Sequence, residues 1–188
     1  MNDHLENLRR DDCLLVLIDI QKVLIDPCVD ADGVRKNAAA LLDVARVFAL
    51  PTLFTVHNAD KLGAALPELS KKAPSAQVID KMEFSGLQNP AMAEAVMQSQ
   101  RSTLLLAGIE SHVCVFHTGA HALRLGYRVH LAADAISSRS AGNRQVGLDR
   151  LAKAGAVISS TEMMIYELLQ RAGTVEFRTL LPLLKTLR

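Results

Sequence analysis

Five short segments of this chain are apolar on both faces, and this feature limits the possible folds more than any other. Their residues are mainly Leu, Val, Ile, Ala and Phe, with little polar alternation. The segments are 13–18, 51–56, 102–107, 127–132 and 155–158. Strands that face water on one side alternate apolar and polar residues, whereas strands of a parallel sheet are covered on both faces. The pattern therefore predicts a parallel sheet, to which the weaker segment 77–80 would add a sixth strand.

Helical patterns lie between the predicted strands. The strongest is a stripe of apolar residues within 34–49 that recurs at the helical period. Further candidates are 90–97, 113–123, 145–152, 163–169 and 175–187, the last interrupted by Pro182. Ser159 and Glu162 have the spacing of a capping box before Met163. Alternating strands and helices predict a three-layer α/β/α architecture, a Rossmann-like open sheet of about six parallel strands with helices on both faces.

The whole chain, residues 1–188, is predicted to form a single domain, because it contains neither an internal repeat nor an interdomain linker. Lys and Arg number 21 against 20 Asp and Glu, which gives a net charge of +1. This balance does not favour nucleic acid or anionic lipid as a partner. Aromatic residues make up only 4% and Trp is absent, so base-stacking surfaces are not expected.

Targeting and cofactor signals are also missing from the sequence. No apolar segment approaches the length of a membrane span, and the polar N-terminal segment lacks the apolar core of a secretory signal. The three cysteines include no C-x-x-C pair. We therefore expect a cytoplasmic protein with reduced thiols and no membrane partner. Neither a G-x-G-x-x-G fingerprint nor a P-loop occurs, so no nucleotide cofactor is expected.

Three reactive side chains follow predicted strands. Asp19 ends the first strand, Lys81 follows 77–80, and Cys114 lies in the first helical turn after 102–107, where Ser111 is a candidate N-cap. Separately, they could be a salt-bridge carboxylate, a solvated lysine and a small buried hydrophobe. The carboxyl ends of parallel strands share one edge of the sheet, so we expect the three to converge on one cleft. An acid, an ammonium and a thiol at a helix N-terminus suit covalent catalysis without a histidine base.

Three segments around these residues match the motifs of a known family. They are 17–21 with its Asp-x-Gln, 81–85 with its Lys, and 108–115 with its Cys. In this order and spacing the chain resembles the isochorismatase-like hydrolases, often called cysteine hydrolases, over roughly residues 12–184. Two further segments, 126–139 and 160–163, resemble the branch of isochorismatase-domain-containing proteins.

The resemblance implies a role for each matching residue. Cys114 would be the nucleophile, Asp19 would take the thiol proton and later activate water, and Lys81 would lower the thiol pKa and orient the acid. The resemblance also implies a cis peptide bond between Ile109 and Glu110, with the backbone N–H groups of Glu110 and Cys114 forming an oxyanion hole. The implied reaction is attack on a carbonyl-type carbon of a small-molecule substrate, loss of ammonia or an amine, and hydrolysis of a thioester.

Departures from the family patterns limit which of the family's reactions and cofactors we expect for this chain. Nicotinamidases of this family bind a metal through an Asp-x-His pattern after the second strand. That pattern is absent from residues 55–60, so we expect no metal and no other cofactor. The family's isochorismatases lack the cysteine, which argues against the reaction that names the family. The predicted substrate pocket is lined by Gln21, Leu24, His57 and Phe84, where Leu24 replaces a frequent aromatic residue.

Two other functions stay open, and several residues receive a structural interpretation. The chain could be a catalytically silent oligomeric scaffold or binding protein, or a thiol-based redox protein, although no resolving cysteine adjoins Cys114. By resemblance we expect a homo-oligomer, with an apolar surface on the last helix formed by Leu180, Leu181, Leu183 and Leu184. His117 and His121 are spaced like metal ligands but lack a third partner. Asp134 is expected to cap the 137–139 turn, and 61–76 to form a loop over the site.

Overall fold

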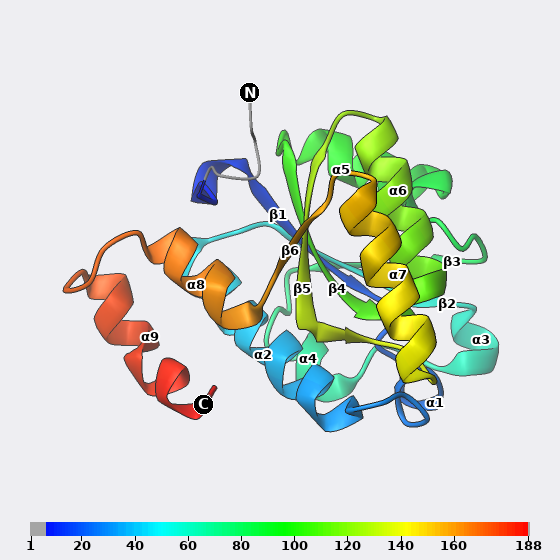
Figure 1. The fold of residues 1–188 in the computed structure, drawn as a ribbon, viewed down its shortest axis with the longest axis horizontal. Coiled ribbons are helices and arrows are strands. Elements are labelled where there is room, and N and C mark those ends of the chain that lie inside the picture. Colours follow the sequence, from blue (N-terminus) through cyan, green and yellow to red (C-terminus); the bar gives the residue numbers. More distant parts are fainter. Residues whose placement is uncertain (1–6, 188) are drawn as a thin grey trace.

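A six-stranded parallel sheet forms the centre of the computed structural model, which describes residues 7–187 (Figure 1). The strands are β1 Cys13–Ile18, β2 Thr52–His57, β3 Gln77–Lys81, β4 Thr103–Ile109, β5 Arg128–Ser137 and β6 Val157–Ser159. Their order is β3-β2-β1-β4-β5-β6, and all neighbouring strands are parallel. The predicted fold class is confirmed, and the weak segment is the edge strand β3. The single domain predicted over 1–188 extends at both ends beyond the described residues and stays a prediction.

Helices cover both faces of the sheet (Figure 1). They are α1 Lys22–Ile25, α2 Ala31–Phe48, α3 Ala59–Leu62, α4 Pro67–Ser70, α5 Pro90–Gln98, α6 Phe116–Arg124, α7 Ala141–Lys153, α8 Thr161–Leu169 and α9 Val175–Thr186. The hydrophobic cluster on one face includes residues of α2, α4, α8 and α9, of which α9 packs against α2 and α8, and the cluster on the other face includes residues of α5, α6 and α7. A turn of π-helix, Ser111–Val115, leads from β4 into α6.

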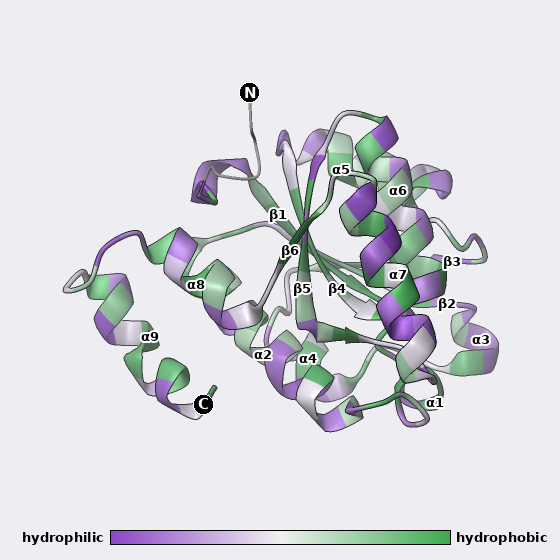
Figure 2. Ribbon diagram, viewed as in Figure 1, coloured by the Kyte–Doolittle hydropathy of each residue, from purple (hydrophilic) through white to green (hydrophobic). Residues whose placement is uncertain are grey.

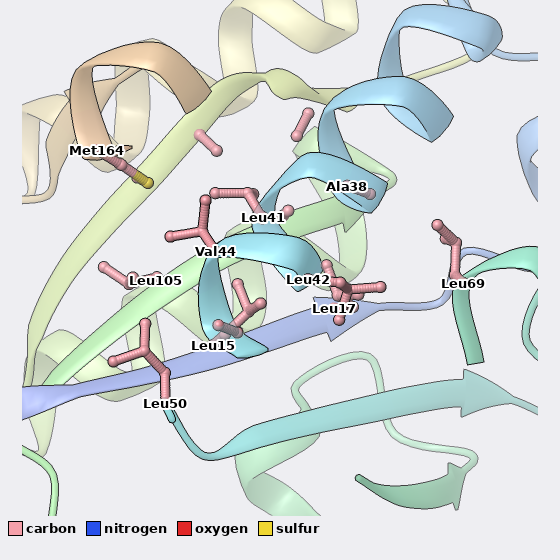
Figure 3. Packing of buried hydrophobic residues seen from close by; sticks show 14 of the residues in the cluster. Leu15, Leu17, Ala38, Leu41, Leu42, Val44, Leu50, Leu69, Leu105 and Met164 are labelled. Atoms are coloured by element: carbon pink, nitrogen blue, oxygen red, sulfur yellow. The ribbon is translucent and has the colours of Figure 1, made fainter. Parts of the chain in front are cut away.

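The strand β1 shows why both faces of the sheet are apolar. Leu15 and Leu17 point into a cluster with α2 and α8, where Leu41 of α2 and Met164 of α8 also lie (Figure 3). The alternate residues, including Val16, point into the second cluster with α5, α6 and α7. The central strands are apolar along their length, whereas the helices carry polar residues on their outer side (Figure 2). Burial on both faces is what removes polar alternation from the sequence.

The beginning of α8 differs from the sequence prediction. The Ser160 Oγ accepts a hydrogen bond from the Met163 N–H at 3.2 Å, so Ser160 rather than Ser159 is the N-cap. The Asp134 Oδ1 accepts hydrogen bonds from the Thr161 N–H at 2.8 Å and its hydroxyl at 2.9 Å. Asp134 therefore caps α8 and not the turn at 137–139, because its side chain reaches the connection that follows β6.

The last helix also corrects two expectations. α9 continues through Pro182, so the proline does not interrupt it. Leu180 and Leu184 lie on either side of that proline and are buried in the cluster around α2, and this packing holds the helix together. Because these two leucines are buried within the chain, the predicted oligomer surface is wrong for them; Leu181 and Leu183 are partly exposed.

The segment 61–76 contains helical turns rather than an irregular loop. It includes the end of α3 and the whole of α4, and it is held against the turn after β1. The Leu66 N–H donates to the Ile20 carbonyl at 3.1 Å, and Gln21 pairs with Ala65 in an antiparallel bridge.

The strand order reverses beside β1, because the chain passes from β1 to β2 on one side and returns to β4 on the other. In such sheets the gap between the diverging connections lies at the carboxyl ends of these strands and holds the ligand. The carboxyl ends of β1 to β4 therefore position the candidate site. Within residues 7–187, no helix is long and apolar enough to cross a membrane.

Candidate active site

A buried ion pair lies at the end of β1. Asp19 turns away from the strand with a φ of 53°, a left-handed conformation that Asp tolerates better than most residues. The Lys81 Nζ donates to the Asp19 Oδ2 at 2.6 Å, and the Thr55 hydroxyl donates to the Oδ1 at 2.6 Å. The Lys81 Nζ also donates to the Glu83 carbonyl at 3.2 Å. Both charged side chains are buried, so each depends on the other for compensation of its charge.

The nucleophile candidate Cys114 lies in the turn of π-helix after β4, at the same edge of the sheet. The turn is preceded by Gly108, whose φ is 128° and where a Cβ atom would overlap the Ile18 backbone. Only glycine allows this close approach of β4 to β1. The peptide bond between Ile109 and Glu110 is cis, at the position that the family resemblance implies.

The helix α7 supports the turn that carries Cys114. The Ser111 hydroxyl donates to the Arg144 carbonyl at 2.8 Å and makes no N-cap hydrogen bond, so its predicted role as an N-cap is wrong. The reason is that the chain enters the turn from the extended Glu110 and directs the Ser111 side chain toward α7. A Cβ atom at Gly147 would overlap Ser111, so α7 lies directly against the turn.

The Cys114 thiol is protonated at rest. Burial first, and the Asp19 carboxylate second, raise its pKa to about 12, although the Lys81 ammonium acts in the opposite direction. This differs from the expectation that Lys81 and the helix N-terminus would favour a thiolate, because burial has the larger effect. The pKa values of Cys13 and Cys28 are also raised by burial, to about 12 and about 11. Cys114 differs from them because its thiol is within hydrogen-bonding reach of a carboxylate, Asp19, whereas the Cys13 and Cys28 thiols donate to backbone carbonyls.

Three of the four predicted pocket residues form one connected unit. The Gln21 side chain is fully buried; it accepts from the His57 N–H at 2.7 Å and donates to the His57 carbonyl at 3.1 Å and the Gly63 carbonyl at 2.6 Å. The His57 ring stacks on Phe84 with ring centroids 5.7 Å apart. Gln21 therefore holds the backbone behind His57, while the half-exposed Phe84 lies at the surface. Leu24 packs against the core cluster around α2.

His57 also brings a third metal-ligating atom to the site. A ring nitrogen of His57, a carboxylate oxygen of Asp19 and the Cys114 Sγ all lie within 4.8 Å of one another. The two histidines with metal-like spacing are placed elsewhere. The His121 Nδ1 lies 3.0 Å from the Ser85 hydroxyl, and the exposed His117 ring contacts Phe84 and Phe116.

Sequence reasoning missed Thr55, Gly147 and the grouping of His57 with Asp19 and Cys114. Thr55 reads as an ordinary β-branched strand residue, and its position near the end of β2 was its only signal. Gly147 lies in a helical pattern, where a glycine without an evident reason indicates close packing. The His57 grouping joins the ends of three strands, and no short sequence motif can record it.

Comparison with known proteins places this geometry among related chains. A family model described as the isochorismatase domain matches residues 13–163. The secreted isochorismatase effector Isc1 of Phytophthora sojae is 34% identical over 176 residues, which cover 92% of this chain and 84% of the relative. Isochorismatase domain-containing protein 2B of Mus musculus is 34% identical over 172 residues, which cover 92% of this chain and 80% of the relative.

Solved structures share the fold along nearly the whole chain. The MAR1 ribonuclease of Caenorhabditis elegans has a TM-score of 0.90 and 27% identity, covering 95% of this chain and 92% of that one. YcaC of Pseudomonas aeruginosa, solved with hexane-2,5-diol and covalent acrylamide, has a TM-score of 0.90 and 27% identity, covering 97% and 96%. YcaC of Escherichia coli, described as an octameric hydrolase of unknown specificity, has a TM-score of 0.86 and 25% identity, covering 97% and 98%.

Proposed function

The chain belongs to the isochorismatase family, and we propose that it is a cysteine-dependent hydrolase of a small, amide-like C–N bond. One observation carries the proposal. A buried carboxylate, Asp19, is held at 2.6 Å by the Lys81 ammonium, and one of its oxygens lies within 4.8 Å of the Cys114 sulfur. This is the arrangement of an acceptor placed beside a protonated nucleophile.

In the proposed first half-reaction Asp19 takes the Cys114 proton while the sulfur attacks the substrate carbonyl carbon. The C–S bond forms as the carbonyl π electrons move to oxygen. The backbone N–H groups of Glu110 and Cys114 then stabilise the oxyanion, an interaction worth roughly 10²–10³ in rate per donor in other enzymes. Collapse of the intermediate breaks the C–N bond, Asp19 returns its proton to the leaving nitrogen, and a thioester remains on Cys114.

In the second half-reaction Asp19 takes a proton from water, which attacks the thioester. The C–S bond breaks, a carboxylic acid leaves, and Asp19 returns the proton to the sulfur. The sum is one amide and one water converted to one acid and one amine. Thr55 and Lys81 bind separate oxygens of Asp19. These two contacts fix the carboxylate while it shuttles the proton.

The test is an ammonia-release screen of small amides, with each reaction quenched and the protein examined by mass spectrometry. We expect turnover by the wild type and an acyl adduct on Cys114 that hydroxylamine removes. We expect Cys114→Ala to abolish turnover while its melting temperature stays within a few degrees of the wild type. Cys28→Ala, which changes another buried cysteine, should keep full activity. Turnover in Cys114→Ala at the wild-type rate would contradict the proposal.

The same screen separates the two alternatives. Peroxide consumption faster than any amide turnover would favour a thiol-based redox protein. If no amide is consumed and Cys114 carries no adduct, a scaffold becomes the better interpretation.

RNA belongs in the screen because the similar C. elegans structure is described as a ribonuclease. We expect no RNA cleavage, because a net charge of +1 offers little attraction for a phosphate backbone.

We further propose that the chain assembles as a homo-oligomer and acts in the cytoplasm. The octameric state of the E. coli relative supports the first proposal, which light scattering tests directly; a monomeric mass would contradict it.

The P. sojae relative is described as secreted, so members of this family need not share one location. Fractionation of cells that express the tagged chain tests the second proposal, and recovery outside the cytoplasm would overturn it.

A further inference from the structure

The hydrolytic mechanism uses Asp19 and Cys114 but gives His57 no step. Yet a ring nitrogen of His57 lies within 4.8 Å of both the Asp19 carboxylate and the Cys114 sulfur. Carboxylate oxygen, imidazole nitrogen and thiolate sulfur are the three ligand types that Zn²⁺ binds in proteins. Each comes from a different strand end, so the fold itself brings the three together.

His57 is held rigidly while one of its nitrogens lacks a partner. Gln21 binds both the N–H and the carbonyl of His57, and Phe84 stacks on the ring. The Nδ1 is buried and makes no hydrogen bond with any residue of the described range 7–187. A buried polar atom without a hydrogen bond destabilises the fold, so such an atom calls for a specific explanation. A ligand bound to this histidine would explain it.

Although the sequence predicts no metal, we propose that Asp19, His57 and Cys114 bind a thiophilic divalent metal ion of the Zn²⁺ type, which blocks the nucleophile reversibly. Zn²⁺ bonds of about 2.0–2.3 Å in a tetrahedron place ligand atoms about 3.3–3.7 Å apart. The observed upper limit of 4.8 Å means that the donors approach one another by no more than about 1.5 Å. On binding, the sulfur gives an electron pair to the metal and its proton leaves to solvent. A water molecule completes the fourth position.

Lys81 selects the type of ion. Its ammonium donates to one Asp19 oxygen and the Thr55 hydroxyl donates to the other, so each oxygen has one lone pair left and the carboxylate is a weakened metal ligand. Mg²⁺ and Ca²⁺ depend on several oxygen ligands, and this group supplies only one carboxylate. Binding must come mainly from sulfur and nitrogen, which favours Zn²⁺ and Co²⁺ over hard cations. The metal site does not depend on the proposed hydrolysis, whereas its inhibitory effect does.

The test titrates Co²⁺ alone into the wild-type protein without substrate. We expect one equivalent to bind, with a thiolate-to-cobalt charge-transfer band in the near ultraviolet and the intense visible bands of four-coordinate cobalt. Mg²⁺ in excess should not displace it. Cys114→Ser should lose the charge-transfer band, and His57→Gln should weaken binding at least tenfold. Thermal unfolding of each variant shows whether it is folded.

Two matched variants serve as controls. Cys28→Ser changes another buried cysteine, and His112→Gln changes a nearby histidine whose Nδ1 lies 3.1 Å from the Ser138 hydroxyl. Both should bind Co²⁺ like the wild type. A missing band in the wild type, or unchanged binding in folded His57→Gln, would overturn the inference.

An alkylation experiment tests the blocking effect. One equivalent of Zn²⁺ should slow the reaction of iodoacetamide with Cys114, and a chelator should restore it; equal rates would overturn the proposed block.

The metal site and the proposed hydrolase activity can fail separately. A cobalt band without amide turnover contradicts the hydrolase and supports the metal site, whereas amide turnover without a cobalt band contradicts the metal site alone.

Discussion

Asp19 has two opposite effects on Cys114. Its negative charge raises the pKa of the thiol and so keeps the proton on sulfur. Each of its oxygens accepts one hydrogen bond and keeps a second lone pair, so Asp19 is the group that takes this proton during attack. The two effects are compatible only if proton transfer and C–S bond formation occur together, because a free thiolate beside a buried carboxylate would be a repulsive pair. A resting thiol also protects the nucleophile, because oxidants react with the thiolate and not with the thiol.

This electrostatic arrangement predicts an unusual response to Asp19→Asn. Removing the charge lowers the pKa of Cys114, so the pH profile of its alkylation by iodoacetamide should move to lower pH. Amide turnover should fall by about 10²–10⁴, the range of a general base. Mass spectrometry of each cysteine after timed alkylation gives the profile.

The neutral control for this experiment is Asp32→Asn, which changes an almost fully exposed carboxylate. It should leave both the profile and the turnover unchanged. A profile that moves to higher pH in Asp19→Asn would contradict the electrostatic account.

At the scale of elements, the nucleophile depends on how α7 packs against the turn of π-helix. Gly147 allows this contact because it has no side chain. Gly147→Ala should force the turn and α7 apart, with a loss of about 1–3 kcal/mol in unfolding free energy, as overpacking generally causes. Turnover and the alkylation rate of Cys114 should both fall, because the sulfur moves relative to Asp19. Urea unfolding and the same two assays measure these effects.

Gly142 on the same helix provides the matched control. A Cβ atom there would meet only the Ser140 hydroxyl, at 3.7 Å, which is an ordinary contact. Gly142→Ala should therefore keep activity and raise stability by up to about 1 kcal/mol, since alanine loses less entropy in a helix. Equal activity in the two variants would show that the α7 contact does not position Cys114.

Elements and their contacts were predictable from the sequence to different degrees. The two-sided apolar segments are visible because burial on both faces acts on every residue of a strand, as in β1 and β4. The N-cap of α8 was misplaced by one residue, since Ser159 and Ser160 are chemically alike and only the backbone decides between them. The role of Asp134 depends on its contact with Thr161, which is 27 residues away, and no local pattern can show such a contact.

The same limit applies to the candidate site at the scale of the whole molecule. Asp19, Lys81 and Cys114 could be predicted because each follows a recognisable strand and because strand ends meet at one edge. The protonation state of Cys114 could not, since it depends on how much solvent the complete fold removes from the sulfur. The same loss of solvent affects all three cysteines and thus links them to the stability of the entire chain.

That link predicts a loss of stability at alkaline pH. The folded thiols have pKa values of about 12, 11 and 12 for Cys13, Cys28 and Cys114, against 9.0 for an ordinary thiol. A raised pKa means that the folded state holds its proton after the unfolded state has lost it. The stabilisation is complete below pH 9 and declines between pH 9 and the folded pKa. In that interval each thiol lowers the unfolding free energy by up to about 1.4 kcal/mol for every unit that the pH rises.

Urea unfolding from pH 8 to pH 11 measures the decline, and Cys13→Ala/Cys28→Ala isolates the part due to thiols. All other ionisable groups are the same in both proteins, so their contributions cancel in the difference. The double variant should lose stability with pH less steeply, by up to about 2.7 kcal/mol per pH unit. It should be somewhat less stable than the wild type at pH 8, because alanine leaves small cavities. Parallel curves would mean that Cys13 and Cys28 ionise equally easily in the folded and unfolded chain. Burial would then not raise the pKa of these thiols, and it could not be the reason that Cys114 is protonated.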